Sequence, residues 1–416
     1  MSEWQTFCLK DLVKIFGGST PPTNNPKNYG NKIRWITAKD LSTLQGRYIK
    51  KGSRSISRLG FKSCSTFLLP KHAILFSVRA PIGYTAIISK RSCTDRGLMG
   101  LVPNKKIYFE FLYYLLKYHK DNISNMGIGT TFKGISKPAL GLFEVKIPPT
   151  YYEQQKIART LSILDQKIEN NHKINELLHK ILELLYEQYF VRFDFLDENN
   201  KPYQTSGGKM KFSKELNRLI PNDFEVKTLG ELMDIFSGYS FQSNTYSNNK
   251  NDHILITNKN VQHSLVDLSI TTNLLFLPKK LPKYCLLKPT NILITLTGHI
   301  GRCALVFSKN CILNQRVGVV LPKEKELNPF YYSLIRNPLF SAILQRNAIG
   351  SSQQNLSPID TLKIQIPFNH KIIKQYSKTC ENIIKLLVSN MQSTQTLTAL
   401  RDFLLPLLLK QQVKPQ

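Results

Sequence analysis

The pattern of apolar and polar positions changes in the same way twice along the chain. Up to about residue 150, short apolar runs such as 73–78 alternate with clusters of Gly, Pro, Asn and Ser, which is typical of short strands and turns. From 153 to 193 neither Gly nor Pro occurs, and apolar residues recur three and four positions apart, which predicts one long amphipathic helix. The same succession begins again near residue 219. We therefore expect an α+β fold with two mixed domains and two long helices.

This succession reflects an internal duplication, because segments of the first half align with segments of the second half when residue numbers are shifted by 218 to 221. Five pairs of segments match in the same order: 4–18 with 224–238, 34–41 with 254–261, 73–87 with 291–305, 127–136 with 348–357, and 143–149 with 362–368. Chance does not produce five ordered matches, so the chain contains two copies of one unit of about 200 residues.

The two predicted helices carry matching apolar stripes. At a shift of 219 only Leu182 breaks the match, because it falls on Arg401. Asn171 and Asn175 lie within the stripe, and buried Asn at such positions usually fixes helix register. The helices could pack as a coiled coil, or each could be an amphipathic helix on its own domain. A helix over 153–193 would span about 60 Å, which exceeds one DNA turn of about 34–36 Å, so the pair could separate two DNA readers.

Charge points to a polyanionic partner. The 416 residues include 57 Lys and Arg against 28 Asp and Glu, a formal charge of +29. Such a charge repels itself in a compact fold, and nucleic acid would relieve it, although a Lys-rich proteome would give the same composition.

Membrane, metal and secretory signatures are missing from the sequence. No apolar run approaches the roughly 20 residues needed to span a bilayer, and the first residues do not form a signal peptide. The seven cysteines show neither a CxxC pair nor zinc-site spacing. We expect a cytoplasmic protein with reduced cysteines and no metal.

Catalytic motifs are incomplete where they occur at all. The segment 16–19 lacks the spaced glycines of a methyltransferase cofactor loop, and 328–331 (Asn-Pro-Phe-Tyr) lacks the second proline of a base-binding motif. Glu144-Val145-Lys146 has no Asp partner at a nuclease-like spacing, and no Walker, HExxH or GxSxG motif occurs. These patterns indicate a chain without catalytic activity of its own.

The ordered features resemble the specificity (S) subunit of Type I restriction-modification enzymes over essentially the whole chain. The markers are Leu9, Leu12, Ile15 and Gly18, then GIGTTFKGIS (127–136), KIPP (146–149), EQQKIA (153–158), YEQYFVRFDF (186–195), LIPNDFEVKTLGEL (219–232) and LRDFLLPLLLK (400–410).

The resemblance implies two target recognition domains related by a pseudo-two-fold axis and separated by two long antiparallel coiled-coil helices. We expect the first domain at 1–150, the first spacer helix at 151–195, a linker at 196–218, the second domain at 219–369, and the second spacer helix with its tail at 370–416.

The resemblance also implies a non-catalytic subunit that binds an asymmetric bipartite site in double-stranded DNA. Methyltransferase (M) subunits, which carry S-adenosylmethionine, and a restriction/translocase (R) subunit would methylate adenine and cut DNA; this chain would hold no cofactor and touch no membrane. A free-standing sequence-specific DNA-binding protein, such as a repressor or architectural factor, and an enzyme with an unrecognised site are the alternatives.

Candidate DNA contacts are loop positions where both copies place polar side chains. Lys and Arg on phosphates supply affinity, whereas Arg, Lys, Asn and Gln on base edges supply specificity. In the first copy these positions are Lys39, Arg79, Arg96, Thr130, Thr131 and Lys133. In the second copy they are Lys259, Thr297, His299, Gln315, Arg316, Ser351, Ser352, Gln353, Gln354 and Asn355. The two sets differ in chemistry, which predicts an asymmetric site.

A basic stretch in the first copy consists of Arg47, Lys50, Lys51, Arg54 and Arg58. It suggests phosphate contacts, although a solvated surface loop would have the same composition.

The start of the first long helix suggests a docking site for a partner. Glu153, Gln154 and Gln155 occur there, whereas the second copy has Ile-Ile-Lys-Gln-Tyr at 372–376. If the triplet docks a methyltransferase subunit, the second docking site is weaker or different. The plainer interpretation is a lost acid at a helix N-terminus, worth about 0.3–1 kcal/mol.

Overall fold

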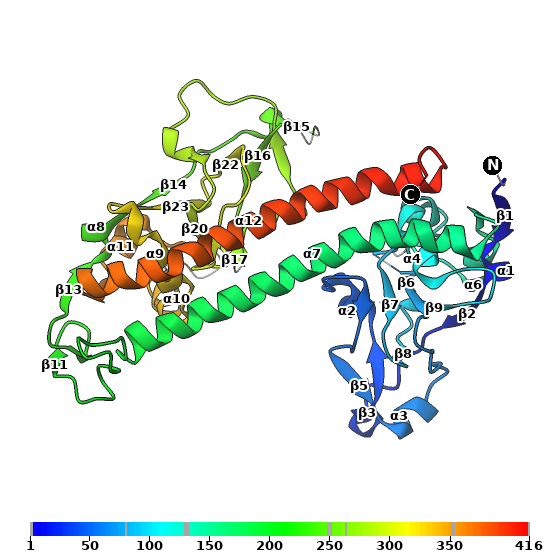
Figure 1. Cartoon of the computed structure of the whole chain (residues 1–416), viewed down its shortest axis with the longest axis horizontal. Coiled ribbons are helices and arrows are strands. Elements are labelled where there is room, and N and C mark those ends of the chain that lie inside the picture. The colour runs from blue at the N-terminus through cyan, green and yellow to red at the C-terminus, as the bar shows by residue number, and fades with distance from the viewer. Residues whose placement is uncertain are drawn as a thin grey trace. The chain divides into compact units, whose positions relative to one another are not determined.

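The computed structural model describes residues 3–79, 81–128, 133–247, 249, 252–262, 264–348, 350 and 354–414. The chain divides into two compact units, unit 1 with residues 1–170 and 394–416, and unit 2 with residues 171–393. The division passes through both long helices (Figure 1). Each unit thus includes one mixed domain and part of both long helices.

Unit 1 is built around a five-stranded sheet, which is antiparallel except where its last two strands pair in parallel. Its order is β2 (Val13–Gly17), β9 (Leu98–Pro103), β6 (Ile74–Ser77), β7 (Thr85–Ile88) and β4 (Tyr48–Ile49). Smaller sheets join β5 (Arg54–Ile56), β3 (Tyr29–Ile36) and β8 (Cys93–Thr94), and β1 (Gln5–Cys8) with β10 (Glu144–Ile147). The short helices are α1 (Leu9–Leu12), α2 (Ala38–Ser42), α3 (Arg58–Lys62), α4 (Phe109–Tyr118), α5 (Lys120–Asn125) and α6 (Lys137–Leu142).

Unit 2 repeats this plan with a larger second sheet. The main sheet has the order β14 (Met233–Ser237), β23 (Val317–Pro322), β20 (Ile292–Thr295), β21 (Cys303–Leu305) and β17 (Ser264–Leu265). The second sheet has the order β15 (Tyr246–Ser247), β18 (Thr272–Leu274), β16 (His253–Ile256), β22 (Cys311–Leu313) and β19 (Leu286–Leu287). The other pairs are β13 (Glu225–Thr228) with β24 (Gln365–Phe368), and β11 (Met210–Ser213) with β12 (Arg218–Pro221). The short helices are α8 (Leu229–Leu232), α9 (Asn328–Arg336), α10 (Pro338–Arg346) and α11 (Pro358–Leu362).

The duplication holds at the level of strand register. Val13 pairs with Pro103 in unit 1, and their equivalents Met233 and Pro322 pair in unit 2. The repeated glycine at 18 and 238 has a steric cause, since a Cβ on Gly18 would lie 1.9 Å from the Asp95 carbonyl oxygen. A Cβ on Gly238 would lie 2.4 Å from the Leu313 carbonyl oxygen. The duplicated sequence therefore encodes a duplicated backbone.

The long helices are α7 (Tyr151–Tyr186), which continues as a π-helical turn over Glu187–Val191, and α12 (His370–Leu409). In unit 2, Asn175 Nδ2 donates to the Leu387 carbonyl at 3.3 Å, and Asn390 Nδ2 donates to Asn175 Oδ1 at 3.1 Å. Farther along α7, the Leu182 carbonyl accepts from Tyr376 Oη at 3.4 Å. Partner numbers on α12 fall as those on α7 rise, so the helices pack antiparallel within this unit. Asn175 is buried as expected, whereas Asn171 is half-buried.

The helix segments of unit 1 also run antiparallel and belong to its core. Ile157, Leu161, Leu408 and Leu409 lie in the same buried cluster as the sheet residues, while Asp165 contacts Arg401. Within each unit, the two helices therefore pack on each other rather than standing apart.

Candidate nucleic-acid interface

Backbone hydrogen bonds join several loops at one end of the main sheet of unit 1. Val78 N donates to the Gly97 carbonyl at 2.9 Å, and Ile135 N donates to the Val78 carbonyl at 2.9 Å. Asp95 N donates to the Ile36 carbonyl at 2.9 Å. These bonds bring together the segments that carry four exposed predicted contacts: Lys39, Arg79, Arg96 and Lys133.

Unit 2 contains the equivalent three bonds. Leu296 N donates to the Arg316 carbonyl at 3.2 Å, Leu356 N to the Leu296 carbonyl at 2.8 Å, and Asn314 N to the Ile256 carbonyl at 3.1 Å. They gather the exposed residues Lys259, His299, Gln315, Arg316, Gln354 and Asn355, together with the half-buried Thr297. The pairing of loop positions inferred from the sequence is thus matched by the backbone.

One turn in each unit is held by a side chain that the sequence analysis did not single out. Gly97 N donates to Asp95 Oδ1 at 3.0 Å, and Arg316 N donates to Asn314 Oδ1 at 3.3 Å. These turns present Arg96 in one unit and Gln315 in the other. Burial raises the pKa of Asp95, although hydrogen bonds from Gly97 and Ala38 partly offset that effect.

A second side chain joins the loop containing the exposed lysine to the following segment. In unit 1, Asp40 Oδ2 accepts from Thr37 N at 2.8 Å, and Asp40 Oδ1 accepts from Ser53 N at 2.8 Å. Burial alone would raise the pKa of Asp40, but hydrogen bonds from Ser53 and Thr37 outweigh it and lower the pKa.

In unit 2 an amide takes the place of this carboxylate. Asn260 Oδ1 accepts from Thr257 N at 3.0 Å, while Asn260 Nδ2 donates to the Asp267 carbonyl at 2.8 Å. The Thr-x-x-Asp/Asn spacing of a helix cap was the sequence signal for this feature, and it occurs at the same place in both copies, over 37–40 and 257–260.

The basic stretch of unit 1 adjoins these loops through the Ser53 bond to Asp40. Lys50, Lys51, Arg54 and Arg58 are exposed, as phosphate contacts require. The Arg54 guanidinium lies 4.7 Å from the centre of the Tyr29 ring, which steadies the side chain without neutralising it.

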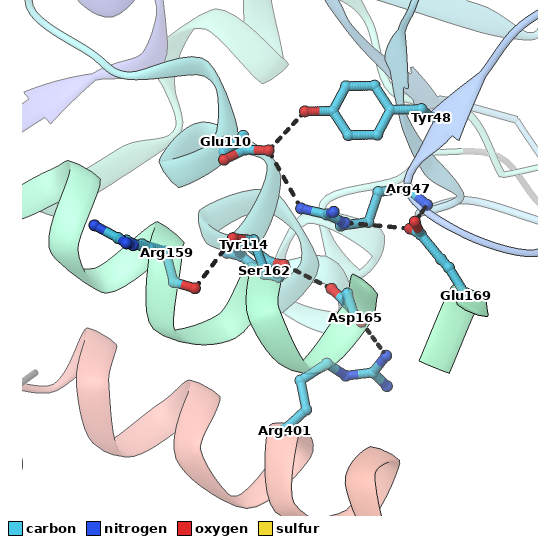
Figure 2. Close-up of polar contacts among 9 residues, drawn as sticks. All are labelled: Arg47, Tyr48, Glu110, Tyr114, Arg159, Ser162, Asp165, Glu169 and Arg401. Carbon is cyan, nitrogen blue, oxygen red and sulfur yellow. Dashed lines mark hydrogen bonds and ion pairs between the residues drawn. The ribbon is translucent and has the colours of Figure 1, made fainter. Parts of the chain in front are cut away.

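Arg47 is different, and its prediction as a phosphate contact is wrong. Its side chain is only 3% exposed. Its Nη1 lies 3.2 Å from Glu110 Oε1, and its Nε lies 3.2 Å from Glu169 Oε1 (Figure 2). Two carboxylates already satisfy the guanidinium, so Arg47 ties the domain to α7.

The predicted docking triplet also separates into different roles. Gln154 is 1% exposed; its Oε1 accepts from Tyr108 N at 2.8 Å, and its Nε2 donates to the Lys106 carbonyl at 3.0 Å. It therefore holds the helix to the domain, and its prediction as a docking residue is wrong. Glu153 is half-buried: its N donates to Thr150 Oγ1 at 3.2 Å, and its Oε2 accepts from that hydroxyl at 3.0 Å. Gln155 is exposed.

The second copy replaces these interactions without losing the helix start. Ile373, equivalent to Gln154, is fully buried, and Asn369 Oδ1 accepts from Ile372 N at 3.2 Å. The departure from Glu-Gln-Gln thus exchanges a polar anchor for an apolar one.

Five predicted contacts lie outside the described residues: Thr130, Thr131, Ser351, Ser352 and Gln353.

Positive charge is concentrated in the first domain. Residues 1–150 contain 24 Lys and Arg against 7 Asp and Glu, a net charge of +17, and residues 219–369 contain 15 against 9, a net charge of +6. Residues 151–195 contain 6 against 7, a net charge of −1. Residues 370–416 contain 7 against 2, a net charge of +5. The electrostatic attraction for a polyanion therefore comes most strongly from the first domain.

Within the described ranges, His, Cys, Asp and Glu side chains form no group of three or more that could hold a metal ion. No helix among these residues is long and apolar enough to cross a membrane.

The fold and its paired loops define a class of protein. The family model "Type I restriction modification DNA specificity domain" matches residues 1–180 and 221–398, so the chain belongs to that family, as its sequence had indicated.

The chain is 30% identical to the Type I restriction enzyme MjaIX specificity subunit of Methanocaldococcus jannaschii, over 97% of this chain and 92% of that protein. It is 24% identical to the Type I restriction enzyme HindI specificity subunit of Haemophilus influenzae, over 76% of this chain and 80% of that protein. The fold is similar to the crystal structure of the Type-I restriction-modification system S subunit from M. genitalium, with a TM-score of 0.59 and 18% identity over 97% and 96% of the two chains.

Proposed function

We propose that this chain is the DNA-recognition subunit of a Type I restriction-modification complex and that it binds a split, asymmetric site in double-stranded DNA. One observation carries the proposal. The same backbone bonds present different exposed side chains in the two units, Arg96 in one and Gln315 in the other. Arg pairs best with guanine in the major groove and Gln with adenine, so equivalent loops would read different bases.

The charge distribution supports the same proposal. A net charge of +17 on residues 1–150 and +6 on residues 219–369 would be attracted to phosphates, while the near-neutral residues 151–195 would not. Each domain would thus bind DNA, and the helices would fix the distance between the half-sites.

The chain would carry no catalytic residues. Methyltransferase subunits with S-adenosylmethionine would methylate adenine in the bound site, and a restriction/translocase subunit would supply cleavage. Exposed Gln155 and the surface of the long helices are the regions we assign to these partners, and we place the complex in the cytoplasm.

Methylome sequencing tests the proposal. A host carrying the neighbouring methyltransferase gene is compared with and without this gene. We expect N6-methyladenine in a split, asymmetric motif only when the chain is present. Identical methylation in both hosts would instead favour a free-standing DNA-binding protein.

Two single variants sharpen the test. Arg96→Ala should relax one half of the motif, and Gln315→Ala the other, with each lost contact worth about 1–3 kcal/mol of discrimination. Lys146→Ala, at an exposed position on β10 outside both the candidate loops and the long helices, is the control and should leave the motif unchanged. If both loop variants altered the same half, the assignment of one domain to each half-site would be wrong.

A further inference from the structure

A cation on α4 in unit 1 lacks the carboxylate that its duplicate on α9 possesses. Lys117 and Arg336 are equivalent at a shift of 219, and each lies over the equivalent tyrosine ring. Lys117 Nζ lies 5.5 Å from the centre of the Tyr113 ring, and Arg336 Cζ lies 5.4 Å from the centre of the Tyr332 ring.

The two cations differ in their partners. Arg336 Nη2 lies 3.1 Å from Glu183 Oε1, which neutralises it. The equivalent carboxylate in unit 1, Asp402, pairs instead with Arg401 at 2.7 Å. Within the described part of the chain, Lys117 makes no ion pair and no side-chain hydrogen bond. Burial lowers the pKa of Lys117 and nearby Arg401 lowers it further, which outweighs the opposite effect of the Asp165 and Asp402 carboxylates. A half-buried cation without a partner is costly to keep unless a ligand supplies the anion.

Lys117 lines a pocket of 270 Å³ that is otherwise suited to an anion. Lys120 lines the same pocket, together with Ser42, Tyr84 and Thr85, and none of the lining residues carries a carboxylate. The stem of Lys120 lies against Gly83, where a Cβ would be 2.4 Å from Lys120 Cγ. At the equivalent Gly301 in unit 2 a Cβ would be 3.3 Å from both Leu344 Cδ1 and Ser341 Oγ, so unit 2 places uncharged side chains where unit 1 places a lysine.

We propose that this pocket binds a phosphate group of the DNA backbone beside the half-site of the first domain. The inference rests on the proposed function. Two ammonium groups complement a phosphate as point charges. The Glu169 carboxylate adjoins the lining residue Gly46, but it is already paired with Arg47 at 3.2 Å. The pocket borders the candidate interface on two sides. Ser42 ends α2, which carries exposed Lys39, and Tyr84 ends the loop that begins at Arg79.

The test uses the full chain in complex with its methyltransferase subunits. It measures, at a series of salt concentrations, how tightly this complex binds a DNA duplex that contains the motif identified by methylome sequencing. Lys117→Met and Lys120→Met, singly and together, remove charge but keep most of each stem. Lys146→Met, at an exposed position on β10, removes the same charge elsewhere in unit 1.

We expect the double variant to reduce the slope of log Kd against log salt by about 1, as for one lost phosphate contact. Affinity should fall by the same factor for cognate and non-cognate duplexes, because a phosphate contact carries no sequence information. The melting temperature of Lys117→Met should rise, since an unpaired charge has left a half-buried position. Weaker binding by a more stable protein separates a ligand-binding role from a structural one.

An unchanged slope in the double variant overturns the proposal. If inorganic phosphate or pyrophosphate then raises the melting temperature of the wild type but not of the double variant, the pocket binds a free phosphate compound instead. If the wild type and Lys146→Met also fail to bind DNA, the proposed function itself has failed. If the wild type binds DNA and the double variant binds it equally well, only the proposal about the pocket is rejected.

Discussion

The two units attach their domains to the long helices with different chemistry on equivalent backbones. In unit 1 the attachment is ionic. Tyr114 Oη donates to Asp165 Oδ2 at 2.6 Å, and Arg401 Nη1 donates to Asp165 Oδ1 at 2.7 Å (Figure 2). Asp165 is only 4% exposed, so its charge depends on these donors.

In unit 2 the buried part of the attachment is aromatic, and its ion pair, Arg336 with Glu183, involves an exposed carboxylate. Phe190 lies 4.8 Å from Phe330 and 5.2 Å from Tyr376, measured between ring centres. The equivalents of Asp165 and Arg401 are Ile384 and Leu182, which are 3% and 2% exposed. The duplication thus preserves the backbone and the filled volume while the type of interaction varies. Removing one partner from the ionic junction should greatly lower the free energy of unfolding of unit 1. Removing one group from the aromatic junction should lower that of unit 2 only slightly.

The largest expected effect is that of Arg401→Leu, which introduces the residue found at the equivalent position of unit 2. It leaves the buried Asp165 carboxylate without its cation, and we expect about 3–5 kcal/mol of lost stability in unit 1, measured by chemical denaturation. Adding Asp165→Ile and Tyr114→Phe should recover most of that loss, because an apolar group can replace a buried ion pair at little cost. A loss under 1 kcal/mol in the single variant would show that the ion pair does not hold the junction.

The second effect depends on pH and belongs to unit 2. His179 is buried, its Nε2 lies 2.8 Å from Tyr332 Oη, and burial together with Arg336 lowers its pKa to about 4. The unfolded pKa is about 6.5, so the unfolded chain binds the proton more tightly. Stability is therefore complete above about pH 6.5 and falls between pH 6.5 and 4, by about 3 kcal/mol in total.

Denaturation curves of the wild type and of His179→Gln over pH 4–7 measure this contribution. The variant should show a flatter dependence for unit 2, while unit 1, where the equivalent residue is Thr398, should be unaffected. Parallel curves would mean that His179 does not titrate in this range.

The smallest expected effect tests the aromatic junction. Tyr376 Oη donates to Ser333 Oγ at 2.8 Å within the ring cluster. Tyr376→Phe keeps the ring and removes this bond together with the longer contact to the Leu182 carbonyl at 3.4 Å, so we expect a loss of about 1–2 kcal/mol in the unit 2 transition. A loss as large as that of Arg401→Leu would remove the contrast between the two junctions.

Much of the fold could be predicted because the duplication supplied an internal comparison. Gly18 and Gly238 occur where a Cβ would collide with a backbone carbonyl, and Asn171 and Asn175 occur where α7 bonds to α12. Local causes of this kind leave a repeated pattern in the sequence. Loop positions such as Arg96 and Gln315 were found because they are polar in both copies.

The errors concern residues whose role depends on distant partners. Arg47 appeared to be one more cation in a basic stretch, but its carboxylate partners are 63 and 122 positions away. Gln154 similarly meets Tyr108 and Lys106 across 46 and 48 positions. Composition cannot distinguish an exposed cation from a buried one when the neutralising charge comes from another element of the fold.

The side chains that shape the candidate DNA loops are not the side chains those loops display. Asp40, Asp95 and their counterparts Asn260 and Asn314 bond to backbone groups. The neighbouring Lys39, Arg96, Lys259 and Gln315 point outward. A lineage could therefore exchange the displayed residues one at a time while inheriting the framework unchanged. The two copies in this chain are one such divergence, already completed within a single gene.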